Sequence, residues 1–550
     1  MVYERKTKSI CPECKKTIDA VIVQEGDKIY MHKTCEEHGS FSDIIATDVE
    51  TYVEAQKYKK FGFPHKDPQM TIKDGCPHDC GMCPNHKSAT TCAMVDVTNR
   101  CNLKCPICYA NADTAGYIVE PPFEDIIRIY KHFRSLKPVP PVVAMYAGGE
   151  PTMRDDLPEI TRELVKMGFK QIQVATNGIR LANDINYFKR LMDAGANVLY
   201  LQFDGIESDT WIKTRGVDLF EKKKQVIENC RKIGFKGVCL VPTIARGVNF
   251  PHEIGNILQF AADNVDVVSG VMFQPVALCG RIEQKDLFDL RVTTYDVLNE
   301  IDKYTNNVMR PWRPFPAFQN LMRLIAWWGS LSGKHIEHVE FTPNPQCGFV
   351  TFMHIEEQDG PNKIVGFNDI IDIDGTIKYC DQQMEKIDNM KEISFFQNLT
   401  LTEFGEKIGK MLDSSLNWLN KRRVQIEGLF EAIKLLKDPF STSAIMLYKM
   451  LLNQSWDNTR DFLVKGNNIY VGVMHFQDEY DLDVERVSQC VVHFGYIDPK
   501  DDKVKQVPFC TMNNLHRPRI ERALAIKYGG LKQQPEKEKE KIVAEPPKIN

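Results

Sequence analysis

The sequence predicts an α/β protein: a partial barrel of about six strand–helix units, with a small metal-binding module before it and a mostly helical domain after it. Three observations predict this class. Apolar strand candidates alternate with helix candidates from residue 93 to about residue 285. Ten of the 17 cysteines lie before residue 109. Beyond about residue 285, longer helix-like stretches replace the alternation. Such alternation indicates a parallel sheet, and six units fit an open barrel better than the closed eight-unit form.

Length and composition fit a globular chain of several domains. At about 150 residues per domain, the 550 residues allow three or four domains. The formal net charge of -4 argues against a nucleic-acid binder driven by bulk positive charge. No apolar run reaches the roughly 18 residues that span a bilayer, and Met1–Lys6 lacks the apolar stretch of a secretory signal. We therefore expect a cytoplasmic protein that touches a membrane at most peripherally, with no transmembrane helix and no nucleic-acid partner.

Residues 1–60 are predicted to form a mononuclear metal module. Cys11 and Cys14 form a Cys-x2-Cys knuckle, and Cys35 and His38 follow about twenty residues later as Cys-x2-His. Two such pairs are typical of a tetrahedral site. The pattern does not separate a zinc ribbon from a rubredoxin-like iron site. It also leaves open that His38 is a bystander and a distant cysteine is the fourth ligand.

Residues 61–92 are rich in Pro, Gly, His and Cys, which predicts a loop wrapped around a metal group. Because four cysteines close a site completely, we expect an auxiliary [4Fe-4S] cluster, with a structural zinc as the alternative. The last of these cysteines precedes Cys101 by nine residues, so the site should lie close to the next one. The four cysteines, with x3, x2 and x8 spacing, are Cys76, Cys80, Cys83 and Cys92.

The barrel is predicted over residues 93–285. Each strand candidate is an apolar run followed by a turn, and amphipathic helix candidates separate most of them. The strand candidates are Ala93–Val97, Val142–Tyr146, Gln171–Ala175, Val198–Phe203, Gly237–Ile244 and Val265–Phe273. The helix candidates are Pro122–Ser135, Leu157–Met167, Ile185–Ala194 and Phe220–Ile233.

The sharpest motif follows the first barrel strand. Cys101, Cys105 and Cys108 stand at x3 and x2 spacing, with Tyr109 next to them. Thiolates are soft ligands suited to iron–sulfur clusters. Three ligands leave one iron of a four-iron cluster without a protein ligand, and a reactive metal centre needs such an open position. A structural zinc loop is the alternative.

Polar residues and glycines end the later strands, where barrels build their active sites. Glycines let a backbone approach a ligand closely, and a carboxylate pairs with an ammonium group. Ordinary strand-ending turns are the alternative. The second strand is followed by Gly148-Gly149-Glu150, the third by Thr176-Asn177, the fourth by Gln202 and Asp204, and the fifth by Thr243.

Residues 286–530 are predicted to form a substrate-binding domain that also holds an auxiliary cluster. Cys347, Cys490 and Cys510 are flanked by Pro, Gly or His and are candidate ligands. Cys380 is the fourth candidate, with His493 as its substitute. Any one of them could instead be a buried thiol. Residues 531–550 form a Lys/Glu/Pro tail that we expect to be disordered.

Together these motifs resemble the radical S-adenosylmethionine (radical SAM) superfamily, in which CxxxCxxC follows the first barrel strand and Gly-Gly-Glu the second. The resemblance implies that S-adenosylmethionine (SAM) binds beside the three-cysteine cluster, with Tyr109 and the strand-end residues around it and Glu150 at its amino group. It implies homolysis to methionine and a 5′-deoxyadenosyl radical, and an electron donor such as ferredoxin or flavodoxin. The expected cofactors are SAM, three [4Fe-4S] clusters and one mononuclear iron or zinc.

The order of the motifs is similar to that of archaeal tetraether lipid synthases, and to the related class D radical SAM methylases assigned to pterin methylation. The first resemblance implies carbon–carbon bonds between unactivated sp3 carbons of isoprenoid diether lipid chains, giving tetraether (GDGT-type) or macrocyclic lipids. The second implies methylation of a 7,8-dihydro-6-hydroxymethylpterin-like substrate. We expect the lipid reaction, because the apolar helix candidates Leu321–Trp328 and Ala444–Leu452 could line a hydrocarbon tunnel. A non-catalytic electron-transfer protein is the third alternative.

Overall fold

The structure is a computed structural model. It describes residues 3–66, 68–80, 82–112, 116–282, 289–331, 339–390, 403–437 and 466–530. The tail predicted to be disordered, 531–550, and the apolar helix candidate 444–452 lie outside the described residues.

The N-terminal module is a four-stranded antiparallel sheet in the order β1-β2-β3-β4. Its two metal-ligand pairs lie in the turn between the first two strands and at the turn between the last two. The strands are β1 (Glu4–Ile10), β2 (Thr17–Glu25), β3 (Lys28–Cys35) and β4 (Gly39–Ala46). The sheet is followed by α1 (Val49–Ala55), whose first turn is capped by Asp48, where Oδ1 accepts from Thr51 N at 3.0 Å, and by the short η1 (Gln56–Tyr58). Among the described residues from 59 to 91 the chain forms no further helix or strand.

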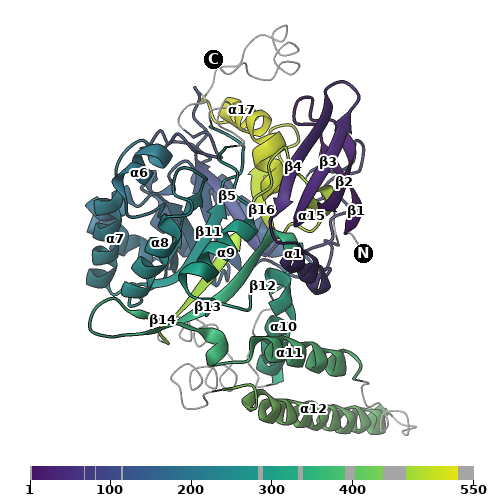
Figure 1. Ribbon diagram of the computed structural model, residues 1–550. Coiled ribbons are helices and arrows are strands. Elements are labelled where there is room, and N and C mark those ends of the chain that lie inside the picture. Colours follow the sequence, from purple (N-terminus) through teal and green to yellow (C-terminus); the bar gives the residue numbers. More distant parts are fainter. Residues whose placement is uncertain are drawn as a thin grey trace.

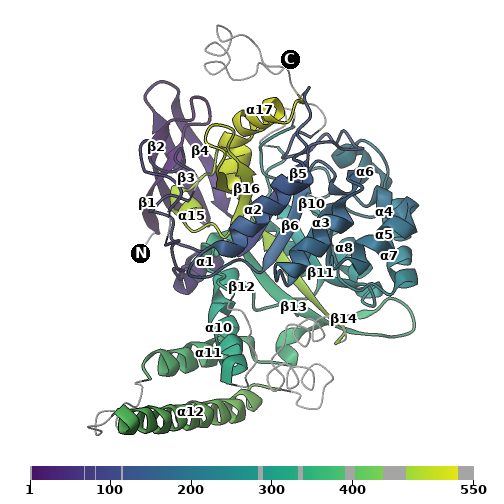
Figure 2. The same ribbon diagram turned by 180° about the vertical axis from the view of Figure 1, so that it is seen from behind.

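Six parallel strands alternate with helices, as predicted. Each strand candidate coincides with an observed strand: β5 (Cys92–Thr98), β6 (Val143–Gly148), β7 (Gln171–Thr176), β8 (Val198–Gln202), β9 (Val238–Val241) with β10 (Thr243–Ile244), and β11 (Val268–Pro275). The outer helices are α2 (Phe123–Ser135), α3 (Leu157–Lys166), α4 (Ile179–Asn183), α5 (Ile185–Asp193), α6 (Ser208–Arg215), α7 (Phe220–Ile233), α8 (Glu253–Asp263) and α9 (Thr294–Tyr304), with the short η2 (Pro151–Met153) after β6. Figure 2 shows α2, α3, α5 and α7 on the outer side of this sheet.

The C-terminal region lengthens the barrel sheet at both edges, which the sequence did not predict. β15 (Asn468–Met474) pairs in parallel with β11, and β16 (Val492–Ile497) pairs in parallel with β5. The order β16-β5-β6-β7-β8-β9-β11-β15 is therefore a run of parallel neighbours. The segment between the two added strands, 475–491, runs from one edge of the barrel to the other and contains α15 (Val484–Ser488).

The remaining C-terminal elements form the rim of this sheet and a helical layer. β12 (Arg313–Pro314), β13 (Gly348–Glu356) and β14 (Lys363–Gly366) lie beyond β15, and β17 (Val504–Pro508) lies beyond β16. The helical layer, α10 (Gln319–Leu331), α11 (Ile373–Asp388) and α12 (Glu403–Ile433), projects from the barrel (Figure 1). The chain also forms η4 (Phe315–Phe318), η5 (Pro345–Cys347), η6 (Phe367–Asp369), α16 (Phe509–Thr511), η8 (Met512–His516) and α17 (Arg517–Lys527).

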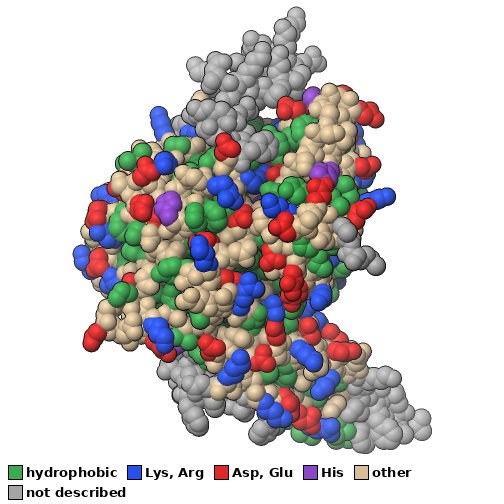
Figure 3. All heavy atoms as spheres, viewed as in Figure 1, with side chains coloured by type: hydrophobic (Ala, Val, Ile, Leu, Met, Phe, Trp, Pro, Cys, Tyr) green, Lys and Arg blue, Asp and Glu red, His purple; other side chains and the backbone are tan. Residues whose placement is uncertain are grey.

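The apolar helix candidate 321–328 lies in α10 and has an ordinary packing role. Leu324 and Trp328 pack against Tyr379 and Met384 of α11 in one buried cluster. Within the described part of the chain, no helix has both the length and the apolar character needed to cross a bilayer. On the face seen in Figure 3, acidic and basic side chains are interspersed.

The two faces of the central barrel strands are buried to different degrees. In β8, Leu199 and Leu201 are fully buried under the outer helices, whereas the inward-facing Tyr200 and Gln202 keep part of their surface exposed. β7 shows the same alternation. In a closed barrel, layers of inward-facing side chains fill the interior. In β7 and β8 the inner face of the sheet, which we call the lumen side, is less completely buried than the outer face.

Candidate active site and metal centres

The loop after β5 carries the three-cysteine motif and is fastened to the far side of the barrel. Cys108 N donates to Arg281 O at 3.1 Å, and Arg281 N donates back to Cys108 O at 2.9 Å. Arg281 Nε also donates to Cys105 O at 2.6 Å. Because Arg281 follows β11, the last barrel strand holds the loop that leaves the first one.

The three thiols lie in one electrostatic environment, since Cys105 and Cys108 both affect the pKa of Cys101, and Cys108 affects that of Cys105. Burial raises the pKa of Cys101 to about 12, and Glu150, Cys105 and Cys108 add to the rise. Burial also raises the pKa of Cys105, opposed by the neighbouring guanidinium of Arg215. Three soft donors beside a buried cation fit a cluster whose iron–sulfide core and thiolates carry net negative charge. The residues present therefore fit a [4Fe-4S] cluster with three protein ligands.

Arg215 connects the cluster loop to the ends of β8 and β10. Its Nε and Nη2 donate to the fully buried Asp204 carboxylate at 2.6 and 2.8 Å. Nη1 donates to Ile107 O at 3.0 Å, and Nη2 donates to Thr243 Oγ1 at 3.0 Å. Gln202 Nε2 donates to Asp204 at 3.1 Å. Asp204 and Thr243 thus accept hydrogen bonds from one arginine, which the sequence analysis missed, and Gln202 joins them through Asp204. All three residues are among those predicted from the strand ends.

Glu150 is buried and joins the loops after β6 and β7. Oε1 accepts from Thr176 Oγ1 at 2.7 Å and from both Thr152 N and Thr152 Oγ1, at 3.1 and 2.5 Å. Oε2 accepts from Asn177 N at 2.7 Å. Four protein donors therefore surround this carboxylate, and Asn177 Nδ2 continues to Asn102 Oδ1 on the cluster loop at 2.7 Å. Its predicted pairing with the SAM ammonium group stays a prediction.

The two glycines before Glu150 are required by the chain itself. Gly148 has a φ of +115°, and a Cβ there would lie 2.2 Å from Thr98 O. A Cβ on Gly149 would lie 2.3 Å from Arg100 O. Gly149 N and Glu150 N donate to these same carbonyls at 2.8 Å each. The Gly-Gly-Glu turn therefore packs directly on the backbone that leads into Cys101.

A buried lysine beneath this region was also missed. Lys223 of α7 is fully buried, donates to Asn177 O, and lies 5.2 Å from the ring centre of Trp211. Burial lowers the pKa of Lys223 to about 7. In sequence, Lys223 stands in a Glu-Lys-Lys-Lys run and Arg215 at a helix end before Gly216, so both look like solvated residues. No signal in the sequence alone separates them from surface charges.

The auxiliary loop brings three of its four cysteines together. Burial raises the pKa of Cys76 to about 12, and Cys83 adds to the rise. The pKa of Cys80 is likewise raised by burial, Cys76 and Cys83. Cys92 lies on β5, where it packs with Cys80 against the same apolar cluster. Asp79 orders the turn by accepting from three consecutive backbone N–H groups, those of residues 73–75, at 2.6 to 2.7 Å.

The C-terminal candidates separate into a group of three and one outlier. Burial raises the pKa of Cys490 to about 12, and Cys347 and Cys80 contribute, so this group borders the auxiliary loop. Burial likewise raises the pKa of Cys510, with contributions from Cys490 and Cys347. The buried cation beside them is Arg486. Burial alone would lower its pKa, but Cys347, Asp481 and Cys510 outweigh burial, so the pKa is raised.

The fourth candidate ligand and its substitute lie elsewhere. Cys380 is in α11, in the apolar cluster with Leu324 and Trp328. His493 points away from the lumen: its Nδ1 is 3.0 Å from Thr90 Oγ1, and its ring lies edge-on to His86 at 5.0 Å. The structure therefore joins neither of them to the other three cysteines.

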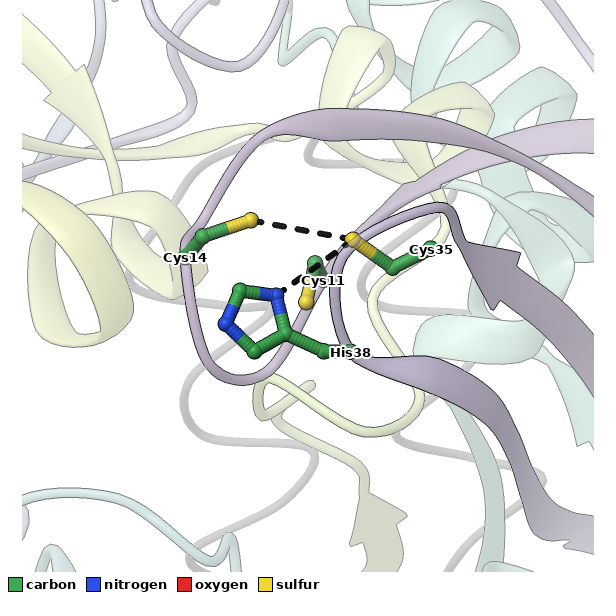
Figure 4. A group of neighbouring side chains, drawn as sticks. All are labelled: Cys11, Cys14, Cys35 and His38. Atoms are coloured by element: carbon green, nitrogen blue, oxygen red, sulfur yellow. Dashed lines mark hydrogen bonds between the residues drawn. The ribbon is translucent and has the colours of Figure 1, made fainter.

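The N-terminal residues form a compact site (Figure 4). The ligand atoms of Cys11, Cys14, Cys35 and His38 all lie within 4.8 Å of one another. Cys14 Sγ is 3.9 Å and His38 Nδ1 is 3.5 Å from Cys35 Sγ. The hydrogen bond from His38 lowers the pKa of Cys35 to about 6. Three sulfurs and one imidazole nitrogen at this spacing fit a tetrahedral metal ion.

The geometry defines the class of protein, and comparison with known sequences agrees. The profile of the radical SAM superfamily matches residues 95–261, so the chain is a radical SAM protein. It uses SAM and a [4Fe-4S] cluster, and it needs an external reductant. A second profile, the HMPTM N-terminal zinc ribbon domain, matches residues 3–47. The N-terminal module is accordingly a zinc-ribbon fold with a mononuclear metal site.

A relationship along nearly the whole chain identifies the family. The sequence is 40% identical over 529 residues to the 7,8-dihydro-6-hydroxymethylpterin dimethyltransferase of Methanocaldococcus jannaschii, covering 95% of this chain and 96% of that protein. The chain belongs to the family of that enzyme. This corrects the prediction of carbon–carbon coupling on archaeal lipids, together with the predicted lipid partner and the tetraether assignment. The four cysteine motifs are shared by both groups and could not separate them.

More distant relatives match a smaller part of the chain. The GTP 3′,8-cyclase of Clostridium acetobutylicum is 26% identical over 198 residues, covering 36% of this chain and 60% of that protein. Among solved structures, SuiB of Streptococcus suis bound to its precursor peptide matches with a TM-score of 0.33 and 16% identity, covering 40% of this chain and 47% of that one. The hydrogenase maturase HydG of Carboxydothermus hydrogenoformans matches with a TM-score of 0.31 and 12% identity, covering 40% and 52%.

Proposed function

We propose that the protein is a radical SAM methyltransferase that acts on a pterin of the 7,8-dihydro-6-hydroxymethylpterin type. The observation that carries this proposal is the 40% identity to the named pterin dimethyltransferase, which extends over 95% of the chain. A match of this length extends beyond the barrel, into the parts of the chain before and after it.

The proposed reactive centre is the loop with Cys101, Cys105 and Cys108. Cys101, Cys105 and Cys108 would hold a [4Fe-4S] cluster through three thiolates, and that cluster would supply the electron for reductive cleavage of SAM. The protein's part is positional. Arg215 and Arg281 hold the carbonyls of the loop, so the three thiols keep one spacing. We propose that SAM lies over the ends of β6 to β10, where Glu150 fixes one turn and Asp204 the next.

The proposed SAM-binding set is the one predicted from the strand ends. It comprises residues that follow β6, β7, β8 and β9, together with the tyrosine after the third cysteine. These residues border the cluster loop or are tied to it through Glu150 and Arg215. The set is Tyr109, Gly148, Gly149, Glu150, Thr176, Asn177, Gln202, Asp204 and Thr243.

We propose that two auxiliary [4Fe-4S] clusters lie beside the lumen. One is held by the cysteines of the loop 61–92 and the other by Cys347, Cys490 and Cys510. The mutual effects of these thiols on their pKa values support the two groups. We propose zinc for the N-terminal site, since a mixed site of three cysteines and one histidine is common for structural zinc. The boundaries 1–60, 61–92, 93–285 and 286–530 remain our proposed division of the chain.

The external reductant is proposed to be a small electron-transfer protein of the ferredoxin or flavodoxin type. Dithionite replaces it in the test of function. Because cleavage to 5′-deoxyadenosine leaves the methyl group of that SAM molecule on methionine, the added carbon must come from a second one-carbon donor. The full-length protein, reconstituted anaerobically with iron and sulfide, is therefore incubated with dithionite, excess SAM, methylenetetrahydrofolate and 7,8-dihydro-6-hydroxymethylpterin, and products are analysed by mass spectrometry. We expect a pterin heavier by one or two methylene units, formed together with 5′-deoxyadenosine. An unchanged pterin in reactions that do produce 5′-deoxyadenosine would refute the proposed substrate.

A further inference from the structure

An unmatched hydrogen-bond acceptor and an unmatched donor lie side by side on the wall of the lumen. Asp96 is on β5, on the same face as Met94, which packs in the lumen cluster. Its Oδ2 accepts from Arg517 Nη1 at 2.6 Å. Asp96 Oδ1 and Arg517 Nη2 are both buried, and neither has a hydrogen-bond partner among the described residues. Buried polar atoms of this kind are rare in native proteins and call for an explanation.

The rest of the arginine is fully engaged, which fixes where its free nitrogen points. Arg517 is 4% exposed. Its Nη1 also donates to Glu521 Oε1 at 2.7 Å, and its Nε donates to Asn513 Oδ1 at 2.9 Å. The guanidinium lies 5.1 Å from the ring centre of Phe494. With Nε, Nη1 and one face of the guanidinium occupied, Nη2 is the only group left for a ligand.

Aromatic rings and the reactive loop border the same place. Phe509 stacks on Phe494 at 5.4 Å between ring centres, and Tyr109 lies 5.6 Å from Phe509. Phe494 is also the ring that lies against the Arg517 guanidinium, so these rings connect Tyr109 to the ion pair. Because Tyr109 directly follows Cys108, the unmatched pair is adjacent to the proposed reactive cluster. Flat aromatic walls suit a planar heterocycle.

We infer that Asp96 and Arg517 bind the lactam edge of the pterin ring, with Asp96 Oδ1 accepting from N3–H and Arg517 Nη2 donating to the 4-oxo oxygen. This inference rests on the proposed function and names the residues that select the substrate. A lactam presents one donor next to one acceptor, which is the complement of the unmatched acceptor and donor. A carboxylate accepts only and a guanidinium donates only, so neither contact can reverse.

The test compares two ligands that differ at this edge alone. 6-Hydroxymethylpterin carries the 4-oxo lactam, whereas 2,4-diamino-6-hydroxymethylpteridine has an acceptor at N3 and a donor at position 4. Their dissociation constants are measured by anaerobic equilibrium dialysis against the full-length holoenzyme, at a pH where the diamino ring is uncharged. A hydrogen bond to a charged group contributes enough free energy to change the affinity by about 10- to 100-fold. We expect the wild type to prefer the lactam by that factor.

Two variants give a matched comparison, because each neutralises one of the two carboxylates that accept a hydrogen bond from Arg517 Nη1. In Asp96→Asn, the amide oxygen stays on Arg517 Nη1, so an NH2 group replaces Oδ1 and the preference for the lactam should fall about tenfold or more. Glu521→Gln removes the other carboxylate on Nη1 but leaves Oδ1 in place, and it should keep the wild-type preference. Each preference is a ratio measured on one protein, so partial loss of folded material cancels.

The outcomes separate the two claims. If the preference is unchanged in Asp96→Asn, or falls equally in both variants, the ion pair is structural and the inference is wrong. If the wild type binds the lactam and the diamino ring equally well, the inference is also wrong, while the proposed pterin substrate stands. If the wild type binds neither ring and methylates no pterin, the proposed function fails, and this inference fails with it.

Discussion

The N-terminal metal site and the reactive loop solve the same problem of placing thiols together, but from different parts of the fold. At the N-terminal site, four ligand atoms lie within 4.8 Å of one another, on two turns of one small sheet. The reactive loop supplies three thiols, and arginines from beyond β8 and β11 hold its carbonyls. A closed site can be built locally, whereas an open site needs the whole barrel to keep its empty position in place.

One thiol at the N-terminal site and one in the reactive loop also differ in how readily they lose a proton. At the N-terminal site the hydrogen bond from His38 lowers the pKa of Cys35 to about 6, so this thiol is poised to become a ligand. At the reactive loop, burial raises the pKa of Cys101 to about 12. Thiols must lose their protons to bind metal. Cys101 therefore depends on the incoming iron to lose its proton, and so does Cys11 of the N-terminal site, whose pKa burial also raises.

The largest expected effect is the loss of SAM cleavage on removing the open site. The triple variant Cys101→Ala, Cys105→Ala, Cys108→Ala should produce no 5′-deoxyadenosine above background, and it should lose about four irons per chain. Anaerobic iron analysis and mass spectrometry measure both. The counterpart Cys11→Ala, Cys14→Ala should lose the mononuclear metal but still cleave SAM. Cleavage by the triple variant would show that the reactive site is elsewhere.

The next largest effect is expected from replacing Arg215, a side chain through which the barrel holds the reactive loop. The N-terminal metal site, by contrast, is built locally on one small sheet. Arg215→Leu leaves the fully buried Asp204 carboxylate without its cation. Removing one partner of a buried pair costs about 3–5 kcal/mol of unfolding free energy. Chemical denaturation should show this loss, and Asp204→Asn combined with Arg215→Leu should recover part of it. Strictly additive effects would mean that the two side chains are not coupled.

A pH experiment compares the surroundings of the reactive loop with the protein surface. Burial lowers the pKa of Lys223 to about 7, below its unfolded value near 10.4. Between these values the unfolded state binds more protons, so the lysine penalises stability below about pH 7 and releases that penalty as the pH rises. Lys223→Met should remove this rise, which is on the order of 3 kcal/mol of unfolding free energy between pH 7 and 10, as measured by chemical denaturation across that range. Its exposed neighbour is the control: Lys222→Met should keep the wild-type slope.

The smallest effect is expected at His38, where one metal ligand replaces another. His38→Cys should keep a tetrahedral metal, and the absorption spectrum of the cobalt-substituted protein should shift to that of four sulfur ligands. Its unfolding free energy should stay within about 1 kcal/mol of the wild type. His38→Ala should bind the metal more weakly. If His38→Ala retains the metal and its spectrum, His38 is a bystander.

Much of the barrel was predictable because its signals are local. Runs such as Val198–Gln202 are apolar, bounded by turns and separated by amphipathic helices, so their strands follow from short windows of sequence. β15 and β16 could not be placed, since their partners β11 and β5 lie far away in sequence. The expectation of a mostly helical region therefore fits its helices, such as α9 to α12 and α17, but it missed the strands that the same region adds to the sheet.

The candidate site was predictable as a set of ligands but not as a network. Cysteine spacing located the reactive loop, and strand ends located Glu150 and Asp204. Arg215 and Lys223 were missed because their roles arise from burial, which their polar neighbours in sequence do not reveal. The substrate prediction was wrong because the cysteine motifs report the cofactor. The residues that select a substrate, such as Asp96 and Arg517 in our inference, lie on distant elements of the lumen wall.

The most direct test of the central claim is Mössbauer spectroscopy of the 57Fe-loaded wild-type protein, recorded with and without SAM. The account predicts that SAM changes the signal of one iron site in one cluster, because SAM binds at the open position of the cluster on Cys101, Cys105 and Cys108, and that the change is absent in the triple cysteine variant. Spectra that stay the same on adding SAM, in protein that binds it, would contradict an open coordination position at Cys101, Cys105 and Cys108.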